Sequence, residues 1–374
     1  MTNRERALNL LHYKPVDRLP AVHFGYWREL VQEWADQGKI PQEIADHYGD
    51  SNEYDKQLDK IIGWDFNWQN MHGARNGLLP AFETKILEVL PDGTQRVQNS
   101  VGLIERIHPG VVSIPSEDDY LLKDRAAFNE LYLPKMQFSP ERINLDYWKN
   151  FNQNVYERSD APVGLALGSV LGEIRSIVSV MGMSYLLYDE DEDLFADIVD
   201  AYADMQYKCV EAILATGAKF DFAHYWEDIC FNNGPLLSPA VFEELCAKHY
   251  KRRNDLCHKY GIDLISLDCD GKTDKLLPTW FENGVNIMFP IEIGTWGDQF
   301  APARAKFGKD MLGVGAMDKT ALRKNKAAVD AELERIRRLA ALGGFIPCPD
   351  HRLMPGTKFE LVQYYAEEIK KIRI

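Results

Sequence analysis

From about residue 160 onward, the sequence alternates short apolar runs with amphipathic stretches of helical length. This alternation constrains the fold more than any other feature, because strand–helix repeats build a parallel sheet that is covered by helices. Two further apolar runs precede it, which gives eight predicted strands, the number that closes a (β/α)8 barrel. The predicted strands are 19–24, 61–66, 163–167, 220–225, 263–267, 285–289, 311–315 and 344–347.

The predicted architecture is therefore α/β, a single (β/α)8 TIM barrel domain that spans residues 1–374. Residues 1–155 include an N-terminal helical extension and a small antiparallel hairpin insertion at about 80–115, where Asp92-Gly93 is a typical hairpin turn. A doubly wound open sheet is the alternative. No GxGxxG motif follows a predicted strand, which argues against the dinucleotide-binding form of that alternative.

Charge and cysteine usage exclude several classes of function. The chain has 43 basic and 57 acidic residues and a formal net charge of −14, so nucleic acid and membrane surfaces are not expected partners. The first eleven residues carry charges in a helical pattern and lack the apolar segment of an export signal. We therefore expect a cytoplasmic protein, in which the six scattered cysteines, none in a CxxC motif, are reduced thiols.

Polar residues follow five successive predicted strands. In a parallel barrel the carboxyl ends of the strands meet at one mouth, where barrel enzymes place their chemistry. These side chains are therefore predicted to share a site, although a carboxylate after a strand can also cap the next helix. The residues are His224, Trp226, Glu227, Asp228, Asp268, Cys269, Asp270, Glu292, Asp318, Cys348, Asp350 and His351.

An ordered set of motifs runs through nearly the whole chain, and on these motifs the sequence resembles the uroporphyrinogen decarboxylase superfamily. The resemblance implies the same (β/α)8 barrel that the alternation predicts. The motifs are Arg4-Glu5-Arg6-Ala7-Leu8, Pro15-Val16-Asp17-Arg18-Leu19-Pro20, Glu227-Asp228, Gly234-Pro235-Leu236-Leu237-Ser238-Pro239, Asp268-Cys269-Asp270-Gly271, Gly315-Ala316-Met317-Asp318-Lys319, Gly343-Gly344-Phe345-Ile346-Pro347 and Asp350-His351.

The superfamily contains true decarboxylases and methyltransferases that work with corrinoid proteins, and one departure separates them. True decarboxylases carry an Arg-Gln-Ala-Gly-Arg stretch soon after Pro-Val-Asp-Arg, and its arginines bind the carboxylates of the porphyrinogen. Here residues 21–28 read AVHFGYWR and keep one arginine. The sequence is thus closer to the corrinoid-dependent methyltransferase branch than to true uroporphyrinogen decarboxylase.

In that branch, zinc is bound by a His-x-Cys pair at one strand end and a distant cysteine on a later strand. Cys269 and Cys348 stand at the matching places, but Leu267 stands where the histidine would be. His224, Glu227 and Asp268 are the candidate replacements, since zinc accepts nitrogen, oxygen and sulfur ligands. Without zinc, both cysteines would be packed thiols beside a carboxylate site.

The resemblance implies a methyltransferase that moves a methyl group between a small substrate (an aryl methyl ether, a methylamine or a thiol) and a corrinoid carried by a separate partner protein. A homodimer is a further candidate assembly. The alternatives are decarboxylation or metal-independent acid–base chemistry on a small polar substrate, and a binding protein that has lost its chemistry. The candidate catalytic residues are Glu227, Asp228, Asp270 and His351; the candidate substrate-binding residues are His23, Tyr26, Trp27, His224, Trp226, Glu292, Asp318 and Asp350.

Overall fold

The computed structural model describes residues 1–108, 115–188, 191, 193–294, 297 and 300–373. Seven parallel strands form its central sheet in the order β15-β14-β13-β12-β9-β8-β3, and β1 pairs with β2, also in parallel. The strands are β1 (Val22–His23), β2 (Phe66–Asn67), β3 (Met71–His72), β8 (Gly164–Gly168), β9 (Phe222–Trp226), β12 (Ile265–Asp268), β13 (Ile287–Ile291), β14 (Leu312–Met317) and β15 (Phe345–Pro349).

Backbone contacts connect these two groups of strands into a ring. Leu353, four residues after β15, donates to the carbonyl of Gly25 at 3.1 Å and accepts from the N–H of Trp27 at 2.8 Å, which joins the segment after β15 to the segment after β1. β2 pairs with β1, and β3 pairs with β8. Because β2 and β3 follow each other closely in the chain, together they occupy one position of the ring. The ring thus has eight positions, as the predicted (β/α)8 barrel requires, and the fold class is confirmed. The strand predicted at 61–66 is wrong in its bounds, because residues 61 and 62 belong to α4 (Glu53–Ile62) and the parallel pairing begins at Phe66.

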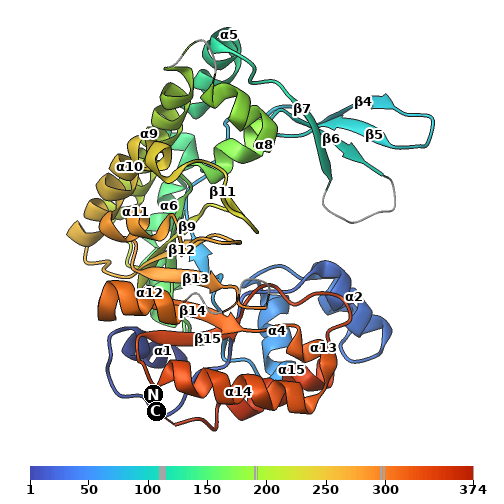
Figure 1. Cartoon of the computed structure of the whole chain (residues 1–374), viewed down its shortest axis with the longest axis vertical. Helices are drawn as coiled ribbons and strands as arrows, with labels where there is room; N and C mark the ends of the chain where they lie inside the picture. Colours follow the sequence, from blue (N-terminus) through green and yellow to red (C-terminus); the bar gives the residue numbers. More distant parts are fainter. Residues whose placement is uncertain (109–114, 189–190, 192, 295–296, 298–299, 374) are drawn as a thin grey trace.

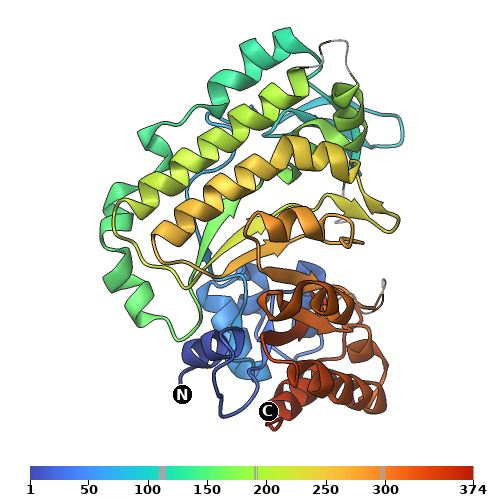
Figure 2. The ribbon, with the colours of Figure 1, turned by 60° about the vertical axis from the view of Figure 1, so that its left-hand side comes forward.

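Helices cover the outside of the strands (Figure 1). The two longest, α9 and α10, lie side by side (Figure 2) and are joined by ion pairs such as Arg252–Asp204 at 3.0 Å. The helices are α1 (Asn3–Leu11), α2 (Arg28–Asp36), α3 (Gln42–His47), α4 (Glu53–Ile62), α5 (Arg125–Ala127), α6 (Leu145–Lys149), α7 (Phe151–Asn154), α8 (Gly172–Leu187), α9 (Leu194–Leu214), α10 (Pro239–Lys259), α11 (Leu277–Glu282), α12 (Phe300–Phe307), α13 (Ala321–Lys324), α14 (Lys326–Ala340) and α15 (Phe359–Ile369).

The insertion is larger than the predicted hairpin. It is a four-stranded antiparallel sheet of β4 (Lys85–Val89), β5 (Gln95–Gln98), β6 (Leu103–Ile107) and β7 (Ser116–Tyr120), and it projects away from the barrel (Figure 1). Residues 109–114 of the predicted insertion lie outside the described residues. The acidic sequence of β7 gives no strand signal, but Asp118 accepts hydrogen bonds from Arg106 of the adjacent β6 and from Arg96 of β5.

Aromatic rings pack inside the barrel below its mouth. Trp68 stacks on Phe222 with a centroid distance of 4.5 Å, and Phe289 contacts Trp68, His224 and Phe24. These rings are almost wholly buried. They form an apolar floor, so the polar side chains at the strand ends stand above a rigid base.

Candidate active site

A cavity of about 410 Å³ lies at the carboxyl ends of β8, β9 and β12. The alternation of side chains along each strand decides which residues reach it. On β9, His224 and Trp226 line the cavity, while Tyr225 between them bonds to Asn254 of α10. The lining residues are Phe24, Gln69, Met71, Ala166, Gly168, His224, Trp226, Asp228, Asp268, Asp270, His351 and Arg352.

Three of the four predicted catalytic residues meet in this cavity. The Nε2 atom of His351 lies 3.1 Å from Oδ2 of Asp270, and the N–H of Asp270 lies 3.4 Å from Oδ1 of Asp228. Burial lowers the pKa of His351, but the hydrogen bond and the charge of Asp270 outweigh it, and the pKa is raised. His351 is thus favoured as an imidazolium that can donate a proton.

Asp228 is held in an unusual backbone conformation. Its φ angle of 51° lies in the left-handed region, which non-glycine residues rarely occupy and which is concentrated at functional sites. Burial, and then the nearby charge of Asp270, raise the pKa of Asp228, and Arg175 lies 3.8 Å from its Oδ2 atom. The turn therefore holds the Asp228 carboxyl group against the backbone N–H of Asp270.

Deeper in the cavity, Asp268 and His224 face each other. Oδ2 of Asp268 lies 3.9 Å from Nε2 of His224 and accepts from the side-chain amide of Gln69 at 3.4 Å. Burial, followed by the charges of Asp270 and Asp228, raises the pKa of Asp268 well above its usual range. Burial lowers the pKa of His224 to about 3, so this imidazole is neutral at physiological pH.

Arg352 forms the rim of the cavity and is bound to Asp50. The two hydrogen bonds from its guanidinium measure 3.0 and 2.6 Å, a bidentate pair. Gly25 packs against this pair with a φ of 102°, and a Cβ atom there would lie 2.4 Å from both partners. Only glycine therefore fits beside the Arg352–Asp50 pair.

Glu227 was predicted to be catalytic or a metal ligand, and the geometry contradicts both roles. It is fully buried and faces away from the cavity. Its carboxylate accepts from the backbone N–H groups of residues 170, 171 and 172 at 2.6, 3.0 and 2.9 Å, from Ser169 Oγ at 3.2 Å and from the Tyr250 hydroxyl at 2.6 Å. Glu227 thus caps the N-terminus of α8, where a negative charge is stabilised.

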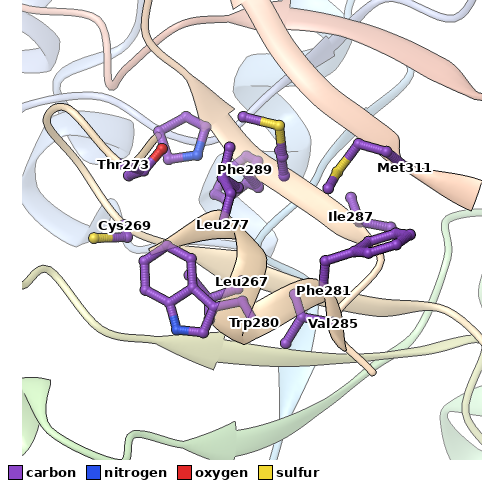
Figure 3. Close-up of a pocket in the computed structure, with 12 residues that line it drawn as sticks. Leu267, Cys269, Thr273, Leu277, Trp280, Phe281, Val285, Ile287, Phe289 and Met311 are labelled. Atoms are coloured by element: carbon purple, nitrogen blue, oxygen red, sulfur yellow. The ribbon is translucent and has the colours of Figure 1, made fainter. Parts of the chain in front are cut away.

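The predicted zinc ligands also lie apart. Cys269 does not line the cavity but a small apolar space of about 20 Å³ beneath α11, with Leu267, Leu277 and Trp280 (Figure 3). Its thiol lies 3.5 Å from the carbonyl oxygen of Asp270. Cys348 lies near Tyr365 of α15, and β13 and β14 separate its strand from that of Cys269.

Among the described residues, no three of the predicted ligands bring their ligand atoms within 4.8 Å of one another. Cys269, Cys348, His224 and Glu227 therefore do not fit a shared zinc ion, and the cysteines are packed thiols.

Three predicted substrate-binding carboxylates shape the loops instead of lining the cavity. Asp350 accepts from the N–H groups of residues 293, 294 and 319 at 3.0, 2.9 and 3.1 Å. Glu292 accepts from the N–H of Gly271 at 2.7 Å, and Asp318 accepts from that of Thr320 at 2.8 Å. Carboxylates after strands act here as backbone caps, the alternative that the sequence left open.

His23, Tyr26 and Trp27, also predicted to bind substrate, do not line the cavity either. His23, Asp55 and Asp59 form the one group of metal-ligating type found among the described residues. However, Nδ1 of His23 accepts from the N–H of Gly25 at 3.0 Å, so Nε2, 2.7 Å from Oδ1 of Asp59, carries the proton. This arrangement satisfies the imidazole with hydrogen bonds and leaves no lone pair for a cation.

Sequence reasoning missed several residues of the cavity wall. Phe24 lines the cavity, whereas its neighbour His23 was predicted to bind substrate. Successive side chains of a strand point to opposite faces, so only one of the two faces the cavity. Gln69, Met71 and Arg352 carry no motif, although Arg352 directly follows His351. Asp268 stands at a strand end and was predicted to share the site, but no catalytic or substrate-binding role was assigned to it.

The model of the uroporphyrinogen decarboxylase (URO-D) family matches residues 159–372, more than half of the chain. The chain belongs to the uroporphyrinogen decarboxylase family. The matched range contains all the cavity residues from Ala166 to Arg352. The family recognised from the sequence motifs is thereby confirmed.

Solved structures resemble this URO-D family protein along most of its length. A methyltransferase from Methanosarcina mazei has a TM-score of 0.59 and 16% identity, and the match covers 99% of each chain. A B12-independent methionine synthase from Shewanella sp. W3-18-1, in complex with selenomethionine, has a TM-score of 0.47 and 12% identity over 95% of this chain and 98% of that one. At such identities the first match supports the shared fold.

A putative vitamin-B12 independent methionine synthase from Listeria monocytogenes matches with a TM-score of 0.40 and 14% identity, over 63% of this chain and 70% of its own. No curated protein matches the sequence. Among the described residues, no helix has the length and apolar character that a bilayer crossing requires.

Proposed function

We propose that this URO-D family protein is a methyltransferase that moves a methyl group between a small substrate and a corrinoid carried by a separate partner protein. The aryl methyl ether, the methylamine and the thiol remain the candidate substrates. The proposal draws on the family, on the full-length likeness to a protein described as a methyltransferase, and on the chemistry of the cavity. It treats the whole chain as one barrel domain; a homodimer and a cytoplasmic location stay predictions.

The observation that carries the proposal is the His351–Asp270 pair inside a cavity at the barrel mouth. Demethylation of an ether or an amine leaves an oxygen or a nitrogen atom that gains an electron pair. A protonated His351, held by Asp270, can supply a proton to that atom as the bond to the methyl carbon breaks. Asp228 and Asp268 would bind and orient the substrate, and the aromatic floor would exclude water from beneath it.

No step is assigned to zinc, because the predicted ligands do not fit a common ion. The corrinoid, when its carrier docks, would supply a cobalt centre that gives or accepts the methyl group. The cavity lies at the end of the barrel where strand-end loops are exposed, so a partner domain can approach a substrate held between Trp226 and His351.

Decarboxylation is the second candidate, because the His351–Asp270 pair could equally protonate a carbanion. The charges of the cavity argue against a polycarboxylate substrate. Asp228, Asp268 and Asp270 line it, and the one arginine in its lining, Arg352, is already bound to Asp50. A substrate with many carboxylates would meet like charges without a free guanidinium clamp.

The test supplies the purified protein with methyl donors of each class and with reduced cobalamin in solution, and follows methylation of the cobalamin by its absorbance. We expect transfer from one donor class, and a loss of roughly 100-fold or more in the His351→Asn variant. Asp310→Asn, which changes an exposed carboxylate far from the cavity, is the matched control and should keep the parent rate. Release of CO₂ from small carboxylic acids, without any methyl transfer, would instead establish the decarboxylase.

A further inference from the structure

The antiparallel insertion β4–β7 has two unlike faces. Residues that oppose each other in neighbouring strands share a face of the sheet, and Glu88, Arg96 and Arg106 oppose one another in this way. Arg96 lies 3.3 Å from Glu88 and 2.7 Å from Asp118, and Arg106 also binds Asp118. This face is an ion-pair network and is suited to contact with water.

The opposite face is partly covered by α8. Ile86 opposes Val97, which opposes Glu105. Glu105 in turn opposes Glu117, whose carboxylate accepts from the N–H of Val180 at 3.2 Å, so α8 packs on this face. The helix lies over β6 and β7, while β4 and β5 extend beyond it (Figure 1).

The part of this face that α8 does not cover exposes aliphatic side chains. Val89 opposes Gln95, two residues before Val97, and therefore lies on the same face as Ile86. Ile86 is 56% exposed and Val89 is 60% exposed. A four-stranded sheet is roughly 19 Å across, and one helix covers roughly 10 Å of it. The face thus has room for a second helix over β4 and β5.

α8 itself carries an apolar stripe on the side that faces away from the sheet. Met183 and Leu186 are buried, whereas Met181, Tyr185 and Tyr188 are 64%, 63% and 84% exposed. The spacing of four and three residues puts these three on one side of the helix, opposite the buried pair. Residues 180–188 contain no charged side chain, although the whole chain has a net charge of −14. An exposed apolar patch without charges is typical of the core of a protein interface.

A strained residue fixes this part of α8 on the insertion. The helix bends at Ser179, whose φ of 68° lies in the left-handed region. The Ser179 hydroxyl accepts from the N–H of Gly182 at 3.1 Å, and a Cβ atom at Gly182 would lie 2.7 Å from the ring of Tyr120 in β7. Such a conformation persists only where the surrounding contacts hold it. The exposed stripe and the exposed strands therefore belong to one packed unit.

We propose that two copies of this chain form a two-fold dimer through this unit. The stripe of α8 from each copy lies over β4 and β5 of the other, so each sheet receives the second helix that its apolar face can hold. The exchange is self-complementary, as a two-fold interface requires, because one chain carries both the helix stripe and the open part of the sheet. The surface consists of Ile86, Val89, Met181, Tyr185 and Tyr188.

The size of this surface is sufficient for a stable dimer. With the exposed fractions given above, its five side chains present roughly 700 Å² per copy, close to the ~800 Å² that each partner of a stable interface buries. None of the five side chains is charged, so no like charges meet within the contact.

Sedimentation velocity of the purified full chain tests the proposal, and we expect a dimer at micromolar concentration. Ile86→Glu and Tyr185→Glu should each weaken the self-association roughly 100-fold, because each puts a carboxylate into an apolar contact. Leu145→Glu, which changes an exposed apolar side chain of α6, is the matched control and should remain dimeric. Circular dichroism verifies that the variants are folded. A monomeric parent, or a dimer that persists in both folded glutamate variants, would overturn the proposal.

Cross-linking tests the reciprocal contact at unchanged charge. All six native cysteines are buried, so introduced thiols react selectively. A mixture of Ile86→Cys and Tyr185→Cys should form a covalent dimer on oxidation in higher yield than either variant alone. No gain in the mixture, or efficient cross-linking of Leu87→Cys to itself through paired β4 edges, would overturn the proposal. Neither experiment uses a substrate, so the result is independent of the proposed function.

Discussion

His351 of the loop after β15 and Asp270 of the loop after β12 lie 3.1 Å apart, Nε2 to Oδ2, although 81 positions separate them in the chain. The pair exists because parallel strands bring their carboxyl ends to one mouth. It links a proton-bearing imidazole to the carboxylate that raises its pKa, and this link governs how activity should depend on pH.

Asp270→Asn is predicted to move the alkaline limb of the kcat profile to lower pH by roughly one unit. His351 acts as an acid, so activity falls as pH rises through its pKa, and loss of the Asp270 charge lowers that pKa toward the ordinary 6.5. NMR titration of the His351 ring, assigned with His351→Asn, measures the shift. An unchanged His351 pKa in the variant would contradict the assignment.

The same pair makes a prediction for stability. Because the folded-state pKa of His351 is raised, its contribution to stability is complete below the unfolded value near 6.5 and is lost as pH rises through the folded value. Asp270→Asn should therefore destabilise the protein more at pH 5.5 than at pH 9. Urea unfolding at the two pH values measures the difference. An equal loss of stability at both would show that His351 does not change its protonation state between them.

Glu227→Gln is predicted to lower the free energy of unfolding by about 2–4 kcal/mol. The amide keeps the shape of the carboxylate but brings an NH₂ group toward the backbone N–H groups at the start of α8 and the Tyr250 hydroxyl. Glu243→Gln, at an exposed position of α10, is the control. If Glu227→Gln kept full stability but lost activity per folded molecule, a catalytic role would be restored to Glu227.

Cys269→Ala and Cys348→Ala are predicted to leave activity and metal content equal to those of the parent and to cost about 1 kcal/mol each through lost packing. The native thiols should react slowly with a disulfide reagent and fast in denaturant, because all six cysteines are buried. Elemental analysis and thiol titration provide the measurements. Stoichiometric zinc in the parent that disappears in either variant would show that the cysteine is a zinc ligand after all.

The sequence was sufficient for the barrel strands from β8 onward, because each of them is a continuous apolar run followed by a helix, a signal that depends only on neighbouring residues. It misplaced the strand predicted at 61–66, whose first residues belong to α4. It was also sufficient for Asp228, Asp270 and His351, since strand ends converge in any such barrel. It could not decide between Glu227 and its neighbours, because side chains alternate between the cavity and the helices, and a shift of one residue exchanges the two faces. The same uncertainty led to the prediction that the Cys269 thiol lies in the cavity, whereas Cys269 lies beneath α11.

Long-range pairs are the other part that no local pattern predicts. Asp50 gives no signal of its own in the sequence, yet it holds Arg352, 302 positions away, at the rim of the cavity. Gly25 is required beside this pair because a Cβ atom there would lie 2.4 Å from both Arg352 and Asp50. Such contacts depend on where the loops of the first and last strands meet, and they are visible only in three dimensions.

The Arg352–Asp50 pair yields the last prediction: Asp50→Ala should lower the free energy of unfolding by about 1 kcal/mol, because it removes both charge-assisted hydrogen bonds from the Arg352 guanidinium. Arg352→Gln should cost a similar amount. If the two residues act as a pair, the double change should cost less than the sum of the two single changes. Asp46→Ala, at an exposed position of α3, is the control. Urea unfolding measures all four variants, and fully additive losses would show that Asp50 and Arg352 do not stabilise the fold through each other.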